Sequence, residues 1–80
     1  MAKVTFPDNF QHFTGGIRDY ETRATVYREL EAELKQKFPG IEDQLAKSSL
    51  ALDGQIYQDP FLEEIESASE IFFMQRIEGG

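Results

Sequence analysis

Few residues of this chain could do chemistry by themselves. There is one histidine, His12, there is no cysteine, and an acidic stretch runs over residues 29–33. A catalytic histidine needs a second group within hydrogen-bond reach, and nothing in the sequence ties one to His12, so we interpret it as a surface residue. Clustered carboxylates on a helix are typical of a solvated face, which we prefer to a metal or partner site. Without cysteine, disulfides and His/Cys metal sites are excluded.

The remaining chemical candidate is the end of the sequence, where Gly79 and Gly80 follow Ile77 and Glu78. By average usage, glycine at two given positions occurs by chance roughly once in two hundred cases. Glycines have no side chains to pack and lose the most backbone freedom when ordered. We therefore expect one domain over residues 1–78 and a flexible tail at 79–80. A frayed end or an engineering scar would give the same two glycines, so the glycines alone do not indicate a function.

Composition limits the class of protein. Eighty residues with 40% hydrophobic content, seven Phe and three Tyr are enough for one small folded domain. The net charge of −7 disfavours binding to nucleic acid and suits a partner with a basic surface, although solubility alone would also explain it. No stretch has the length of a membrane span and no signal peptide is recognisable, so we expect a cytoplasmic protein without membrane contact.

Three stretches have the composition of strands. Residues 2–6 alternate, with Val4 and Phe6 on one face, before a proline; residues 17–22 alternate weakly and carry charges, which is typical of an edge strand. Residues 71–74 are apolar at every position, as in a strand at the centre of a sheet. We expect this last strand to pair with the first.

A helix is predicted after the strand at residues 17–22. Thr25 is the expected N-cap, and Val26, Leu30, Leu34 and Phe38 recur every four residues as one apolar stripe. Favourable Glu–Lys pairs lie on the opposite side, and a Pro-Gly pair follows the last turn.

The second half of the chain predicts a short hairpin. An Asp-Gly pair at 53–54 lies between residues 50–52 and 55–57, and this dipeptide favours a tight two-residue turn. One more helical turn is expected at 41–46 and another at 61–65, with Leu62 and Ile65 pointing inward. The predicted core between helix and sheet consists of Val4, Phe6, Val26, Leu30, Leu34, Leu50, Leu52, Ile71 and Phe73.

This order of elements predicts an α+β domain, with a mixed sheet of four to five strands and one main helix packed on one face. The order and spacing of six motifs carry a resemblance to a known family: residues 13–16 (FTGG), 24–26 (ATV), 38–40 (FPG), 53–54 (DG), 70–73 (EIFF) and 77–80 (IEGG). With these motifs the sequence resembles the ubiquitin-like β-grasp sulfur carriers, which include the molybdopterin synthase small subunit and the thiamine-pathway carrier. Gln75-Arg76 stands where molybdopterin synthase small subunits commonly have Pro-Pro, so no particular sulfur pathway is implied.

The resemblance implies a specific chemistry at the tail. In such carriers an adenylating, E1-like partner enzyme uses ATP and magnesium to activate the terminal carboxylate, here that of Gly80, which then becomes a thiocarboxylate. Gly79 and Glu78 would lie in the partner's tail-binding channel. The carrier itself would bind no cofactor or metal, would act as a protein cosubstrate and not as an enzyme, and would deliver sulfur to a synthase or lyase.

A partner surface follows from strand geometry. If Ile71 and Phe73 face the helix, Phe72, Met74 and Arg76 face the other side of the sheet. Phe, Met and Arg are enriched in interfaces, so we predict that these three residues bind the partner enzymes.

Two alternatives to a sulfur carrier remain open. A ubiquitin-like modifier would use the same activation of Gly80 but end in an isopeptide bond to a lysine. A plain protein-interaction module would carry the two glycines incidentally.

Overall fold

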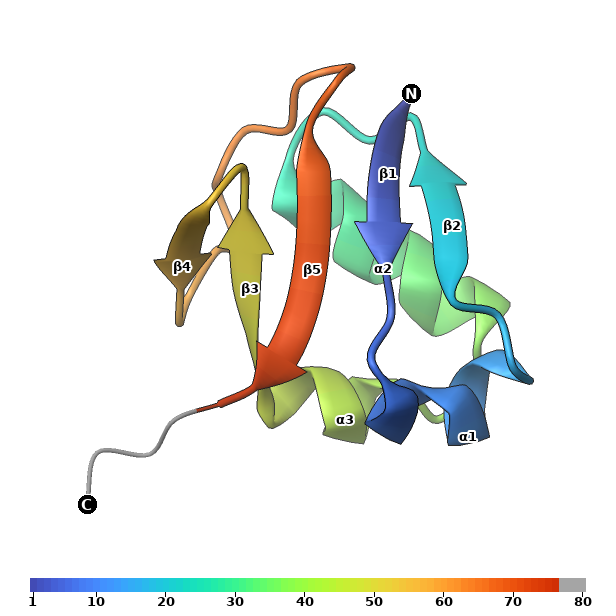
Figure 1. Cartoon of the computed structure of the whole chain (residues 1–80). Coiled ribbons are helices and arrows are strands. Elements are labelled where there is room, and N and C mark those ends of the chain that lie inside the picture. Colours follow the sequence, from blue (N-terminus) through green and yellow to red (C-terminus); the bar gives the residue numbers. More distant parts are fainter. Residues whose placement is uncertain (77–80) are drawn as a thin grey trace.

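The computed structural model of this chain describes residues 1–76, so residues 77–80, including the predicted tail at 79–80, lie outside the described part. Five strands form one mixed sheet in the order β2-β1-β5-β3-β4, and helix α2 crosses one of its faces (Figure 1). The predicted α+β architecture is confirmed. The elements are β1 (Ala2–Thr5), the 3-10 turn η1 (Asp8–Phe10), α1 (Gln11–Thr14), β2 (Asp19–Thr22), α2 (Tyr27–Lys37), α3 (Glu42–Ala46), β3 (Ser48–Leu52), β4 (Gln55–Tyr57) and β5 (Glu70–Gln75).

Strand β5 occupies the centre of the sheet, as its apolar sequence predicted. It runs parallel to β1, where Val4 lies opposite Ile71, and antiparallel to β3, where Leu50 lies opposite Phe73. The predicted pairing of the first and last strands is therefore confirmed. The charged strand β2 lies at one edge, also as predicted, and the three-residue strand β4 lies at the other.

The start of helix α2 differs from the prediction. Val26 has extended backbone angles (φ −144°, ψ 148°) and forms an isolated bridge with Glu64, so the helix begins only after it. Thr25 is not the N-cap: its backbone N–H and its hydroxyl both donate to the Glu29 carboxylate, at 3.0 and 3.1 Å. Val26 is half-buried and does not belong to the core stripe. A β-branched residue fits the extended bridge well, which explains the later start.

The core stripe of α2 is shifted as a consequence. Tyr27 takes the place predicted for Val26 and is 4% exposed, and Leu30 and Leu34 follow it at helical spacing with no exposure. The other eight predicted core residues are buried. Aromatic rings gather around Phe73, whose ring centroid lies 5.1 Å from that of Phe10 and 6.0 Å from that of Phe6.

The segment after β4 is also partly different from the prediction. Ile65 is buried at 4% exposure, but Leu62 is 71% exposed, so its predicted inward direction is wrong. The Glu63 N–H donates to the Pro60 carbonyl at 2.8 Å, which closes a single turn that does not continue as a helix. Tyr27 N–H then donates to the Glu63 carbonyl at 2.9 Å, and the segment is held against the start of α2 by its backbone.

The predicted β3–β4 hairpin is confirmed, and its tip is tied to the start of β5. Asp53 and Gly54 both have positive φ (49° and 87°), as a type I′ turn requires. The Asp53 carboxylate accepts hydrogen bonds from the Ser69 hydroxyl at 2.8 Å and from the Glu70 N–H at 2.9 Å. Ser69 Oγ in turn accepts from the Glu66 N–H at 2.9 Å. These bonds fix the turn before β5 relative to the hairpin.

Within residues 1–76, no helix has both the length and the apolar composition that crossing a membrane would require.

Replacing Phe73 with Ala should lower the free energy of unfolding by about 3–5 kcal/mol, because it opens a cavity where several rings meet. That is a large part of the stability of a domain of this size. Denaturant unfolding measures the loss. Phe72→Ala on the opposite face is the matched control and should cost clearly less. A loss below about 1 kcal/mol for Phe73→Ala would contradict the packing described above.

Replacing Ser69 with Ala should lower the free energy of unfolding by about 1–3 kcal/mol, because a buried hydroxyl that bonds Asp53 and the Glu66 N–H is removed. Ser67→Ala is the matched control, since Ser67 is exposed two residues away. If both variants unfold at the same denaturant concentration, the tie between hairpin and β5 contributes nothing.

Candidate functional site

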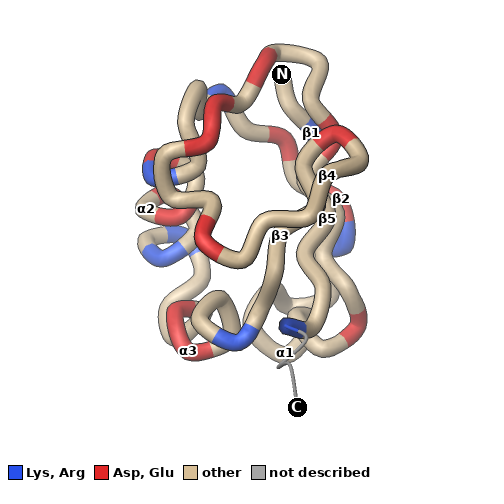
Figure 2. The backbone as a smooth tube through the Cα atoms, turned by 90° about the vertical axis from the view of Figure 1, so that its left-hand side faces the viewer, with Lys and Arg blue, Asp and Glu red and all other residues tan. Residues whose placement is uncertain are grey.

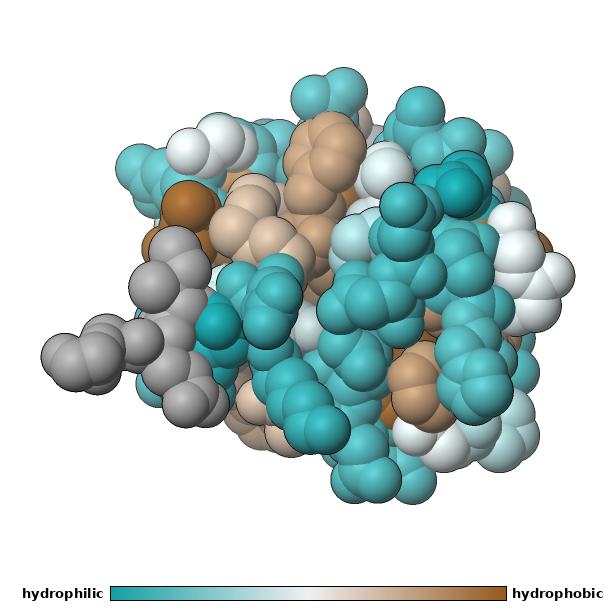
Figure 3. All heavy atoms as spheres, turned by 60° about the horizontal axis from the view of Figure 1, so that its bottom comes forward, coloured by the Kyte–Doolittle hydropathy of each residue, from teal (hydrophilic) through white to brown (hydrophobic). Residues whose placement is uncertain are grey.

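The predicted site has two parts, a tail and a surface beside it. Gly80, Gly79 and Glu78 lie outside the described residues, so their roles stay predictions. The surface can be followed on β5 and its neighbours. Figure 3 views the molecule with the end of β5 turned toward the reader, and apolar side chains lie there among a mostly hydrophilic surface.

The side chains of β5 alternate between two environments, as strand geometry predicted. Ile71 and Phe73 are 0% and 4% exposed and face α2. Phe72 is 44% exposed on the other face, and Met74 is half-buried beside it. Phe72 and Met74 are therefore oriented as predicted, whereas the binding role of Phe72, Met74 and Arg76 stays a prediction.

The apolar surface extends beyond β5, which sequence reasoning missed. In the register of the sheet, Phe72 lies opposite Ala51 of β3, and Ala51 lies opposite Ile56 of β4. Ile56 is 57% exposed. Together with Met74 these residues form a continuous row, the open-face strip. The signal was present in the sequence, because the Asp-Gly turn sets the hairpin register and with it the face of Ile56.

Arg76 lies where the described chain ends. Its backbone N–H donates to the Lys47 carbonyl at 2.9 Å, which extends the β5–β3 pairing past the last strand residue. Its Nη2 lies 3.9 Å from Oδ1 of Asp59, so its side chain reaches toward the segment that follows β4. Arg76 is thus at the border of the open-face strip and not in its middle.

His12 and the acidic stretch at residues 29–33 make local side-chain contacts. His12 is exposed and its ring meets the edge of Phe13, with centroids 5.2 Å apart. In the acidic stretch, Glu31 pairs with Lys35 at 3.0 Å, and Glu33 accepts a hydrogen bond from the Tyr20 hydroxyl.

Local electrostatics in this part of the molecule follow from the same contacts. Burial, reinforced by the hydrogen bond to Glu33 and its charge, raises the pKa of Tyr20 to about 12. Hydrogen bonds from Thr25 hold the pKa of Glu29 below its usual value. No group of three His, Asp or Glu residues within 1–76 is placed to hold a metal ion.

Comparison with known proteins establishes the fold. No protein-family model matches the sequence, and no curated protein matches it either. A chain in the crystal structure of the Amycolatopsis orientalis BexX/CysO complex matches with a TM-score of 0.84 and 16% identity, over 100% of both chains. Mycobacterium tuberculosis CysO, described as an antigen, matches with a TM-score of 0.82 and 11% identity, over 96% of this chain and 100% of that one.

A third solved structure is a putative molybdopterin converting factor, subunit 1, from Pyrococcus furiosus. It matches with a TM-score of 0.69 and 21% identity, over 95% of this chain and 97% of that one. At these identities the likeness concerns the fold, which is the ubiquitin-like β-grasp fold in all three cases. The expected fold class is confirmed.

Proposed function

We propose that this chain is a sulfur carrier protein. A partner enzyme adenylates the carboxylate of Gly80, the carboxylate is converted to a thiocarboxylate, and the sulfur is passed to an accepting enzyme in cofactor or amino-acid biosynthesis. The chain is the cosubstrate of these reactions. The adenylating partner, and not the carrier, uses ATP and magnesium.

The observation that carries the proposal is the match of the whole described fold to CysO and to a putative molybdopterin converting factor subunit. The sequence adds a second line of support, because Gly79 and Gly80 follow the central strand after a spacer of only three residues, 76–78. The open-face strip adds a third, since an exposed apolar row on the strand that precedes the glycines in the sequence suits a protein that must dock on its enzymes.

The chemistry needs an unhindered terminus. A carboxylate is a poor electrophile until it is joined to AMP, with pyrophosphate as the leaving group from ATP. A persulfide sulfur then displaces AMP, and a thiol reduces the resulting acyl disulfide to the thiocarboxylate. Both steps take place inside a narrow pocket of the partner that excludes water. Glycines have no Cβ to meet the walls of such a pocket or to shield the carbonyl carbon.

Intact mass spectrometry tests the proposal. The chain is isolated from its own cells, or after incubation with its activating enzyme, ATP and a sulfur donor, and its mass is measured. A gain that corresponds to one oxygen exchanged for sulfur at Gly80 supports the carrier. Conjugates linked to lysine would show a protein modifier instead, and an unchanged mass with active enzyme would overturn the proposal.

Deleting Gly80, or adding one residue after it, should abolish sulfur loading, because the reacting carboxylate is displaced along the partner's channel. The unfolding midpoint should stay that of the parent chain. Loading is followed by mass spectrometry and folding by circular dichroism. Loading of an extended chain that keeps its extra residue would contradict the mechanism.

Replacing Phe72 with Glu should also abolish loading, since a charge would enter the docking surface. Thermal stability should change little, because the side chain is already 44% exposed. Glu21→Lys on the edge strand β2 is the control for a charge change on the same sheet away from the strip. If Phe72→Glu unfolds the protein, the residue belongs to the core and the docking surface lies elsewhere.

A further inference from the structure

The turn between β3 and β4 contains Asp53 followed by Gly54, and neither residue has a chemical role in the proposed function. Both residues are exposed, and a Cβ placed on Gly54 would meet nothing within 4 Å. Figure 2 views the molecule from the side of β4, the edge strand that follows this turn. A carboxyl group and the next backbone nitrogen therefore lie side by side at a position that water can reach.

An aspartate before a glycine can react with its own backbone. The Gly54 nitrogen bonds to Cγ of Asp53 and loses its proton, while one carboxyl oxygen leaves as water, and the product is a five-membered succinimide. Closure within one chain needs no collision, and glycine has no side chain to hinder its nitrogen. Water then adds to either carbonyl of the ring. Addition at the α-carbonyl of Asp53 breaks the bond to Gly54, so that the chain runs through Cγ as isoaspartate.

The native structure binds both oxygens of this carboxyl group. Oδ2 of Asp53 accepts from the Ser69 hydroxyl at 2.8 Å, and Oδ1 accepts from the Glu70 N–H at 2.9 Å. The Asp53 N–H also donates to the Glu70 carbonyl, at 3.0 Å. Ring closure expels one of these oxygens as water and turns the other away from its donor. The same bonds that hold the hairpin against β5 therefore oppose the reaction.

The hydroxyl that binds Asp53 is itself fixed. Ser69 is 3% exposed, and its Oγ accepts from the Glu66 N–H at 2.9 Å. Breaking hydrogen bonds of a buried group is unfavourable, so the turn is closed most of the time. Local openings still occur far more often than global unfolding. The reaction should therefore proceed from the open turn, at a rate proportional to its population.

We propose that Asp53 is a modification site, at which the chain isomerises to isoaspartate through the succinimide with Gly54 whenever the bonds to Ser69 and Glu70 open. The product carries a free α-carboxylate on an exposed turn. That group is the substrate of methyltransferases that act on isoaspartyl residues with S-adenosylmethionine. The modification does not depend on the fate of Gly80.

Isomerisation would alter the face of the sheet beside β5. The isomer has one more backbone carbon in the turn, so the two-residue type I′ geometry that pairs Leu52 with Gln55 is lost. The turn sets the hairpin register, and with it the place of Ile56 opposite Ala51 in the open-face strip. This consequence for docking rests on the proposed function, whereas the modification itself does not.

The test follows isoaspartate in the full chain near neutral pH. It is measured by methyl transfer from labelled S-adenosylmethionine with a purified isoaspartyl methyltransferase, and it is assigned to a residue by electron-transfer fragmentation. Asp43, which precedes Gln44, is the internal control and should react at least about tenfold less than Asp53. Asp53→Glu should remove the signal, because closure would need a larger ring. As little isoaspartate at Asp53 as at Asp43 would overturn the proposal.

Two variants locate the protection. Ser69→Ala should raise the rate at Asp53 about fivefold or more, because loss of a buried hydroxyl raises the open population. Tyr20→Phe is the control and should stay within twofold, since it removes a hydrogen bond to Glu33 at the opposite edge of the sheet. An unchanged rate in Ser69→Ala, or an equal rise in Tyr20→Phe, would show that these bonds do not govern the reaction.

The parent chain gives a second measurement that needs no variant. The Glu70 amide donates to Asp53, so its hydrogen exchange reports the opening of the turn. In dilute guanidinium chloride, below the unfolding transition, the exchange rate of this amide and the rate of isoaspartate formation should rise by the same factor. Faster exchange without faster isomerisation would overturn the proposal. Because no activating enzyme is present, the outcome is separate from that of sulfur loading.

Discussion

Strand β5 lies between β1 and β3, so both edges of its backbone are hydrogen-bonded within the sheet and only its two faces are left for other contacts. One face carries Ile71 and Phe73 into the core below α2, and the other carries Phe72 outward. A single helix can cover one side of a small sheet and not both. The division between a stabilising face and an exposed apolar face is therefore set by this one strand, and its last residues lead to the glycines.

Much of this fold could be predicted from local sequence patterns. The apolar run at 71–74 indicated a central strand, and the Asp-Gly pair at 53–54 indicated the hairpin, because positive φ at both positions restricts which residues can be used. The face of Phe72 followed from alternation alone. These features are determined within a few residues of chain, which is why one sequence was sufficient.

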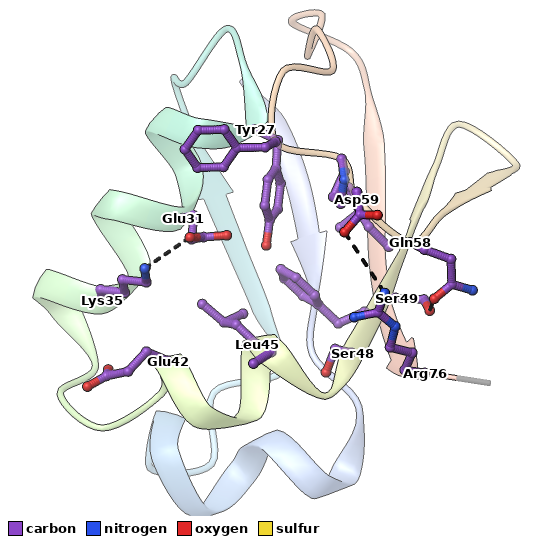
Figure 4. Close-up of a pocket in the computed structure, with 15 residues that line it drawn as sticks. Tyr27, Glu31, Lys35, Glu42, Leu45, Ser48, Ser49, Gln58, Asp59 and Arg76 are labelled. Carbon is purple, nitrogen blue, oxygen red and sulfur yellow. Dashed lines mark hydrogen bonds and ion pairs between the residues drawn. The ribbon is translucent and has the colours of Figure 1, made fainter. Parts of the chain in front are cut away.

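Features that depend on distant partners could not be predicted in the same way. Val26 has the spacing of a helical core residue, but Glu64, nearly forty positions away, pairs with its backbone and keeps it extended. Leu62 has the composition of a buried residue, but the backbone bonds of Pro60 and Glu63 set its direction outward. A cavity lined by residues of α2, α3, β3, β5 and the segment 58–61 (Figure 4) has no sequence signal at all, because only the tertiary fold brings these five segments together.

The open-face strip and the cavity share β5 but use opposite sides of it. Phe72 and Met74 belong to the strip, whereas Phe73 and Arg76 line the cavity. The proposed function requires docking on an activating enzyme and then on an acceptor. The apolar strip would supply affinity that both partners can use, because a Met side chain such as that of Met74 adapts to more than one surface.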